Sequence, residues 1–317
     1  MIRVDRLTKR YNAATAVDHV SFEVGRGEIV GLLGPNGAGK TTTMRMLTTF
    51  LAPTSGRAAL AGHDVLDEPL EVRRSVGYLP ESVPLYLEMR VREYLSYRAK
   101  LKDVPWSKRR AAIDGVLERC RIGDVQDRVL GQLSKGYRQR VGLADAMVHD
   151  PDILILDEPT AGLDPIQIRE VRALIRELGE RHTILLSTHI MSEVEAVCGR
   201  VIIIARGRIA ADQPLDQLRS ESTIVVEARG PADAVRRALE TAPGVERVVP
   251  AGVEGDHASF EVRTHDGADL REALGQRVFQ NGWPLRRLDL RHVTLEDRFV
   301  EAVTRESISA AVDREAV

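Results

Sequence analysis

Short apolar runs alternate with helix-length segments along residues 1–220 of the chain. Runs such as EIVGLLG, SVGYLP, DILILDEP, HTILLST and RVIIIA are almost uninterrupted by polar residues, as in strands that are buried on both faces. Such strands, separated by helices, predict an α/β fold with a covered sheet. Between about residues 82 and 148 the apolar spacing is helical instead, which predicts an all-helical lobe inserted between two strands.

The pattern changes after residue 220. Four strand-like runs and two amphipathic helices follow in the order β-α-β-β-α-β, namely STIVVEAR, ADAVRRALETA, GVERVVPAG, ASFEVRTH, ADLREALGQRVFQNG and PLRRLDLRH. This order predicts a small α+β accessory domain of ferredoxin-like type over residues 221–317. The segment VTLEDRFVEAVTRE predicts a closing helix, and the last dozen residues predict a frayed tail.

The composition mainly excludes certain partners and kinds of site. The chain has 317 residues and a formal net charge of −2, so it offers no basic field for nucleic acid, and no nucleic-acid partner is expected. Its two cysteines, Cys120 and Cys198, fit neither a disulfide framework nor a zinc site, which favours a reducing cytoplasm. The longest apolar stretches, near VIIIA, are far shorter than a membrane span, so any membrane role would depend on a partner.

The segment GPNGAGKTT is the first candidate functional motif in the sequence. It follows an apolar strand, precedes a helix and has the glycine, lysine and threonine spacing of a phosphate-binding loop, although a glycine-rich turn without chemistry is the alternative. Backbone N–H groups of such a loop wrap a phosphate at the positive end of the helix dipole. We expect Lys40 to reach the β- and γ-phosphates and Thr41 to ligate Mg²⁺. The other loop residues expected to contact nucleotide are Gly34, Pro35, Asn36, Gly37, Ala38, Gly39 and Thr42.

Two adjacent carboxylates end the apolar strand within ILILDEPT. Asp157 and Glu158 lie at its carboxyl end, the edge at which open parallel sheets bind ligands. Strand alternation predicts that they lie on opposite sides of the chain. We expect Asp157 to hold Mg²⁺ through water and Glu158 to act as the general base for the attacking water. A surface Asp-Glu turn is the alternative, and the phosphate-binding loop upstream argues against it.

The segment LSKGYRQR, from Leu133 to Arg140, resembles the signature motif of ATP-binding cassette (ABC) ATPases, which usually reads LSGGQ before a basic helix. The resemblance covers residues 1–220 and implies a P-loop NTPase core that binds and hydrolyses ATP with Mg²⁺. It also implies a homodimer in which Ser134 and Gly136 of one copy close on the γ-phosphate held by Lys40 of the other. Ser134 is expected to be the N-cap of the following helix as well.

Three further residues each resemble a functional position of the family, and a fourth departs from it. Tyr11 resembles the aromatic residue that stacks on adenine, with an isolated exposed tyrosine as the alternative. His189 resembles the switch histidine that contacts the γ-phosphate and orients water. Asp164 resembles a residue of the loop through which the two copies sense each other's site, and equally suits an N-cap before Pro165. Glu81 departs from the family, which has glutamine there; the glutamate keeps an oxygen ligand for Mg²⁺ but adds negative charge.

The resemblance further implies a separate membrane permease, and hence a cytoplasmic protein that is peripheral on the inner face of the cell membrane. The apolar residues from Leu85 to Met89 follow Glu81, where such ATPases receive a permease helix; a self-packed loop is the alternative. LPESVPLY, LSKGYRQR and the small C-terminal domain together most resemble ATPase subunits of gliding-motility and copper exporters. A soluble ABC ATPase acting on a macromolecular complex is the alternative function. The C-terminal domain is expected to stabilise the dimer or contact the permease, or alternatively to sense a ligand.

Overall fold

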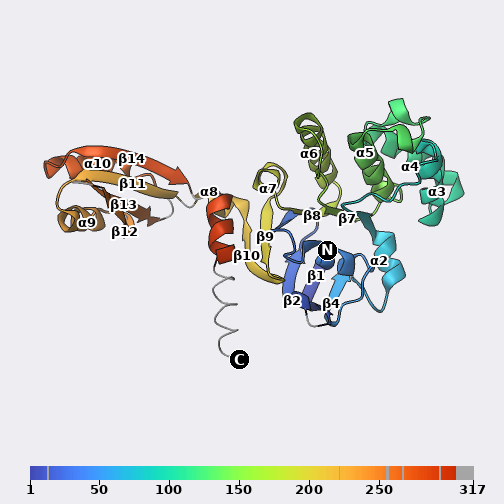
Figure 1. Ribbon diagram of the computed structural model, residues 1–317, viewed down its shortest axis with the longest axis horizontal. Helices are drawn as coiled ribbons and strands as arrows, with labels where there is room; N and C mark the ends of the chain where they lie inside the picture. The colour runs from blue at the N-terminus through green and yellow to red at the C-terminus, as the bar shows by residue number, and fades with distance from the viewer. Residues whose placement is uncertain (13, 221, 255–256, 266–267, 293, 305–317) are drawn as a thin grey trace. The chain divides into compact units, whose positions relative to one another are not determined.

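The computed structural model describes residues 1–317 except 13, 221, 255–256, 266–267, 293 and 305–317 (Figure 1). The chain divides into two compact units, of which the second spans residues 214–298 and the first contains the remainder. The sequence analysis places this boundary at residue 220 and assigns the closing helix to the second domain. In the structure the helical residues 299–304 are grouped with the first unit. The tail expected for the last dozen residues lies outside the described part of the chain.

A six-stranded sheet forms the centre of the first unit. β3 pairs in parallel with β8 and β9, and β7 pairs in parallel with β6 and β8. Every residue of β7 and β8 is buried, which explains why these strands are continuous apolar runs in the sequence. In spatial order the strands are β10 (Arg208–Pro214), β9 (Arg200–Ala205), β3 (Ile29–Leu33), β8 (Thr183–Thr188), β7 (Ile153–Asp157) and β6 (Val76–Leu79).

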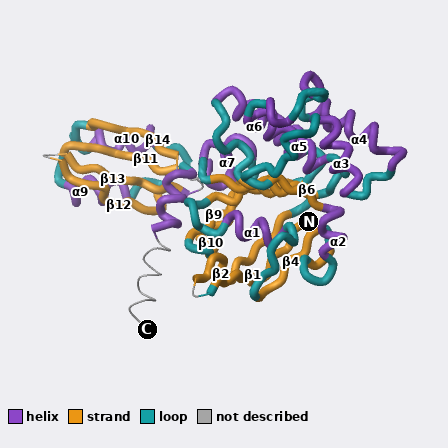
Figure 2. Tube along the Cα trace, turned by 45° about the vertical axis from the view of Figure 1, so that its right-hand side comes forward, coloured by secondary structure: helices purple, strands orange, loops and turns teal. Residues whose placement is uncertain are grey.

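Helices cover one face of this sheet (Figures 1 and 2). Leu154 and Leu156 of β7 belong to the apolar core shared with these helices, whereas Ile153 and Ile155 belong to the core on the opposite face. The region between residues 82 and 148 is helical, as the sequence predicts. The helices on this side are α3 (Val91–Leu101), α4 (Trp106–Arg119), α5 (Lys135–Met147), α6 (Pro165–Gly179) and α7 (Met191–Val197).

The opposite face is covered by helix α1 (Lys40–Leu47) and a second, antiparallel sheet (Figure 2). The sequence analysis names no strand of this sheet. Buried and exposed residues alternate along residues 20–24 of this sheet, and Leu7 and Val20 pack in one core with Met44 of α1. Helix α2 (Pro69–Ser75) follows this sheet in the chain. In spatial order its strands are β2 (Ala14–Val24), β1 (Ile2–Tyr11), β4 (Ser55–Leu60) and β5 (His63–Asp64).

The second unit is a four-stranded antiparallel sheet with two helices packed on it. Its strands lie in the order β12, β13, β11, β14, which is the ferredoxin-like arrangement of a β-α-β-β-α-β chain and confirms the predicted α+β domain. Phe260 and Val226 of the sheet pack against Val235 and Leu274 of the helices. The elements are α8 (Leu215–Ser220), β11 (Ser222–Arg229), α9 (Ala232–Glu240), β12 (Val245–Glu254), β13 (His257–Thr264), α10 (Arg271–Gln280) and β14 (Leu285–His292).

Candidate active site

The loop between β3 and α1 has the backbone of a phosphate-binding loop. Gly37 and Gly39 adopt positive φ angles of 78° and 105°, a region that residues with a Cβ rarely enter. Gly34 approaches another strand so closely that a Cβ there would lie 2.4 Å from the carbonyl oxygen of Ile204. A Cβ on Gly39 would lie 2.6 Å from the carbonyl oxygen of Ala16. Backbone conformation and close packing therefore both require glycines in this loop.

Lys40 begins α1 and is buried, with 6% of its side chain exposed. Its ammonium donates to the carbonyl oxygens of Gly34, at 2.7 Å, and Pro35, at 3.3 Å. The same Nζ lies 3.4 Å from Oε1 of Glu158. The ammonium is thus held between the loop and the strand-end carboxylate, where it can bind an anion that enters the loop.

Asp157 ends β7 and is completely buried. Its Oδ1 accepts hydrogen bonds from Thr41 Oγ1, at 3.2 Å, and from Ser187 Oγ, at 2.5 Å. Its Oδ2 has no hydrogen-bond partner among the described residues. A buried carboxylate oxygen without a donor is suited to a cation, and the hydroxyl of Thr41 next to it supplies a second oxygen ligand.

Glu158 directly follows β7 and has a φ of 48°, a left-handed conformation that is unfavourable for a residue with a Cβ. Its backbone N–H donates to the carbonyl oxygen of Ser187, at 3.2 Å, and to the Ser187 hydroxyl, at 3.1 Å, and these bonds hold the strained backbone in place. Its Oε2 lies 2.9 Å from Nδ1 of His189, which follows β8. Glu158 therefore contacts His189 through one oxygen and Lys40 through the other.

Lys40, Glu158 and His189 line a cavity of about 350 Å³, whereas the buried Asp157 does not. The structure brings together most of the phosphate-binding loop with Glu81, Glu158 and His189, as the sequence analysis expects. The lining residues are Ala16, Asn36, Gly37, Ala38, Gly39, Lys40, Thr41, Thr42, Glu81, Glu158, Ala161 and His189. Tyr11 does not line the cavity; it is 47% exposed at the end of β1, with the Lys9 ammonium 5.4 Å from its ring centre.

Three further predicted residues also lie outside the cavity. Ser134 is exposed and caps α5, because its hydroxyl accepts from the backbone N–H of Tyr137 at 3.4 Å. Gly136 is buried so close to Gln167 that a Cβ would lie 2.6 Å from the amide carbon of that side chain. Asp164 caps α6 by accepting from two backbone N–H groups of its first turn. The predictions that Ser134 and Asp164 are N-caps are therefore confirmed.

Sequence reasoning missed residues that support the two carboxylates. Ser187 holds the side chain of Asp157 and the backbone of Glu158 at once. The signal was present in the sequence, since a hydroxyl residue near the end of a buried apolar strand must find a partner inside the protein. Which partner it finds depends on the pairing of β7 with β8, in which Asp157 lies opposite Ser187.

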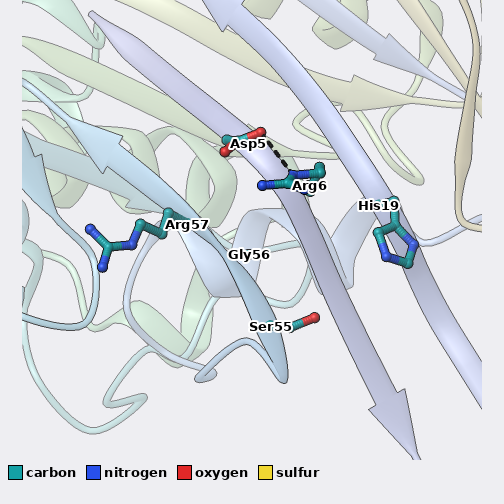
Figure 3. Close-up of a pocket in the computed structure, with 6 residues that line it drawn as sticks. All are labelled: Asp5, Arg6, His19, Ser55, Gly56 and Arg57. Atoms are coloured by element: carbon teal, nitrogen blue, oxygen red, sulfur yellow. Dashed lines mark ion pairs between the residues drawn. The ribbon is translucent and has the colours of Figure 1, made fainter.

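A second hollow, of about 410 Å³, lies on the antiparallel sheet (Figure 3). Two of its side chains are exposed and paired with carboxylates: Arg6 lies 3.5 Å from Asp5, and His19 lies 2.6 Å from Asp18. We assign no chemistry to this exposed surface. The lining residues are Asp5, Arg6, His19, Ser55, Gly56 and Arg57.

Comparisons with known proteins agree with this geometry. The family described as ABC transporter matches residues 17–161. The bacitracin transport ATP-binding protein of Bacillus licheniformis is 34% identical over 311 residues, covering 96% of this chain and 97% of the relative. The Nod factor export ATP-binding protein I of Paraburkholderia xenovorans is 41% identical over 254 residues, covering 79% of this chain and 83% of the relative.

Solved structures support the same assignment. The structure of an ATP-binding subunit of an ABC transporter matches with a TM-score of 0.63 and 32% identity, covering 69% of this chain and 92% of the other. A dimeric bacterial ABC transporter cassette has the same TM-score of 0.63 at 24% identity, which shows the shared fold. Motifs, fold and relatives together show that the chain belongs to the ABC transporter family and is an ATP-binding subunit of that family with ATPase activity.

Proposed function

We propose that two copies of this chain close head to tail around two ATP molecules and that hydrolysis drives a separate membrane permease. The single observation that supports the proposed dimer is the position of Ser134. In one copy this residue is exposed at the first turn of α5 and lies outside the cavity that contains Lys40 and Glu158. A second copy can therefore present the first turn of its own α5, with the positive end of the helix dipole, to the phosphates.

Within the cavity each residue has a distinct role. Lys40 binds the β- and γ-phosphates, and in doing so exchanges its present contacts with the loop carbonyls for charged oxygens. Glu158 accepts a proton from the attacking water through the oxygen that now faces Lys40 or His189. His189, 2.9 Å from this carboxylate, orients the water and donates toward the γ-phosphate.

The buried oxygens also fit Mg²⁺. Thr41 and Glu81 line the cavity. Asp157 does not line it, but its Oδ1 accepts from the hydroxyl of Thr41, and its Oδ2 has no partner among the described residues. These residues would hold the ion together with phosphate oxygens, and the bound ion would neutralise phosphate charge. The carboxylate of Glu81, in place of the family's glutamine, adds a negative charge to this set.

Cysteine crosslinking tests the dimer. A variant with Asn36→Cys and Ser134→Cys carries one thiol on the phosphate-binding loop and one on the signature helix. We expect disulfide-linked dimers on oxidation with ATP present and far fewer without it. A matched variant with Asn36→Cys and Ser107→Cys, in which the second thiol lies on exposed α4, should not crosslink. Equal crosslinking by the two variants, or none by either, would refute the head-to-tail arrangement.

The permease is expected to bind next to Glu81. Leu85 and Met89 pack against the apolar core of the helical lobe, whereas Tyr86 and Leu87 are 50% and 45% exposed. Tyr86 also contacts the ring of Tyr97 at 5.7 Å, which keeps this exposed surface ordered. Among the described residues no helix is long and apolar enough to span a membrane. We therefore propose a protein that is peripheral on the inner face of the membrane through its permease.

The pairing of LPESVPLY with LSKGYRQR supports a more specific proposal, a subunit of the gliding-motility or copper-exporter type. The ferredoxin-like unit is proposed to stabilise the dimer or to contact the permease. Co-sedimentation with membranes that contain or lack the candidate permease tests the assignment. We expect recruitment only when the permease is present, and weaker recruitment for Tyr86→Ala with Leu87→Ala. Equal recruitment to both kinds of membrane would contradict a permease-dependent role.

A further inference from the structure

A third carboxylate lies beneath the strand ends that carry Glu158 and His189. Glu193, in the first turn of α7, is only 3% exposed and matches none of the motifs described above. Its Oε1 accepts a hydrogen bond from the hydroxyl of Thr160, and its Oε2 accepts one from the hydroxyl of Thr188, at 2.7 Å. The side chain therefore uses both oxygens to connect two separate segments of the chain.

These two threonines flank the residues that contact each other in the cavity. Thr160 lies two residues after Glu158, on the loop that follows β7. Thr188 is the last residue of β8 and directly precedes His189. The bridge through Glu193 therefore holds together the loops whose side chains meet at 2.9 Å between Glu158 Oε2 and His189 Nδ1.

Glu193 is a buried carboxylic side chain with a cation beside it. Burial of a charge is unfavourable unless that charge is paired and hydrogen-bonded. Here the compensating cation is Arg172 of α6, whose guanidinium lies 3.7 Å from Oε1 of Glu193 and donates to Ser192 at 3.2 Å. A glutamine at position 193 would keep the shape but offer a single acceptor oxygen and no charge, so one threonine hydroxyl would lose its acceptor and Arg172 would lose its ion pair.

We propose that Glu193 is a positioning residue for ATP hydrolysis, which fixes Glu158 and His189 relative to each other through Thr160 and Thr188. The inference rests on the proposed roles of Glu158 and His189. It predicts an effect on turnover without an effect on nucleotide binding, because Glu193 does not line the cavity.

The test compares Glu193→Gln with Glu195→Gln, an exposed carboxylate on the same helix. For Glu193→Gln we expect kcat to fall on the order of 10- to 100-fold, with KM and the dissociation constant for ATP unchanged. Glu195→Gln should keep the wild-type kcat. An unchanged kcat in folded Glu193→Gln, or an equal loss in both variants, overturns the inference.

Changes at Thr188 keep the test decisive if Glu193→Gln does not fold. Thr188→Val removes the hydroxyl but keeps the shape, and we expect it to reduce kcat, whereas Thr188→Ser should recover most of that loss. In the double variant with Glu193→Gln, the loss should be smaller than the sum of the two single losses, because both changes remove the same bridge, although Thr188→Val also removes the acceptor of the Ile190 backbone N–H. Full additivity, or equal kcat for Thr188→Val and Thr188→Ser, overturns the inference.

Glu158→Gln, measured in parallel, separates this inference from the function on which it rests. If that variant hydrolyses ATP normally, the proposed role of Glu158 fails and the positioning role of Glu193 fails with it. If Glu158→Gln is inactive while Glu193→Gln and Thr188→Val are fully active, only the positioning role fails.

Discussion

Two buried aspartates of the first unit differ in how completely their oxygens are paired. Asp145, on α5 in the helical lobe, accepts from Arg98 at 2.9 and 3.0 Å and from Tyr94 at 3.2 Å, and lies 3.1 Å from the ammonium of Lys102. Asp157, at the end of β7, leaves Oδ2 without a partner among the described residues.

The difference separates a structural cluster from a binding site. Burial by itself would raise the pKa of Asp145, but Lys102 and Arg98 together hold that pKa below its ordinary value, so the charge is compensated inside the protein. At the nucleotide site, Oδ2 of Asp157 has no partner among the described residues. A buried carboxylate oxygen left without a donor is available to a ligand, whereas the paired oxygens of Asp145 serve the fold.

Removal of the general base should give the largest effect. We expect Glu158→Gln to reduce ATP hydrolysis at least about 100-fold, because the amide cannot accept the proton of the attacking water. The phosphate contacts remain, so ATP should still bind and should hold the two copies in a closed dimer. Steady-state hydrolysis and size-exclusion chromatography with ATP measure the two effects. A monomer with bound ATP would contradict the dimer.

Disruption of the cluster around Asp145, in which both carboxylate oxygens are paired, should instead reduce the stability of the fold. We expect Asp145→Asn to lower the free energy of unfolding by about 3 kcal/mol, because the partly buried cations of Arg98 and Lys102 would lose the carboxylate that compensates them. Asp114→Asn, which removes an exposed ion pair with Arg92, should cost less than about 1 kcal/mol. Urea denaturation measures both values, and similar losses in the two variants would show that the cluster is not structural.

The pKa of Asp145 also gives this stabilisation a pH dependence. The pKa of Asp145 is lower in the folded protein than in the unfolded chain, where it is about 3.9. The stability that the ionised carboxylate contributes is therefore fully present above about pH 3.9 and is lost as the pH falls through the pKa of the folded protein. Asp145→Asn should therefore lose less stability on acidification than the wild type does.

Lys40→Ala should weaken nucleotide binding without destabilising the helical lobe. We expect ATP affinity to fall on the order of 100-fold, about 2.7 kcal/mol, because the ammonium that binds the phosphates is removed. Isothermal titration with a non-hydrolysable ATP analogue measures the loss, and unfolding of the helical lobe should be unaffected. Wild-type affinity in this variant would remove Lys40 from the nucleotide site.

The smallest effect concerns His149, which lies next to the Asp145 cluster. Burial, and to a lesser extent the charge of Lys102, lower the pKa of His149 to about 4, and its Nε2 lies 3.2 Å from the carbonyl oxygen of Val76. Since the unfolded state binds the proton more tightly, stability should fall by about 1 to 2 kcal/mol between pH 7 and pH 5. His149→Gln should reduce this slope, whereas His63→Gln should not; an unchanged slope in both would exclude His149 as its source.

Much of the fold was predictable because its signals are local. The buried strands of the parallel sheet are continuous apolar runs, and the helical lobe has a clear helical period. The antiparallel sheet was missed because β4 and β5 do not form a distinct apolar run, and because the pairing of β4 with β1 joins residues about 50 positions apart in the sequence. The ferredoxin-like unit was predicted because each of its elements follows the previous one with a short connection.

The sequence by itself determined the phosphate-binding loop, the strand that ends in Asp157 and the caps at Ser134 and Asp164, since each depends on backbone conformation and hydrogen bonds within a few residues. Only the tertiary structure decided which oxygen of Asp157 stays unpaired, how Ser187 holds the strained Glu158, and that Glu193 joins two loops. Those outcomes depend on the register of β7 against β8 and on the packing of α6 and α7, which bring together side chains that are about 30 residues apart in the sequence.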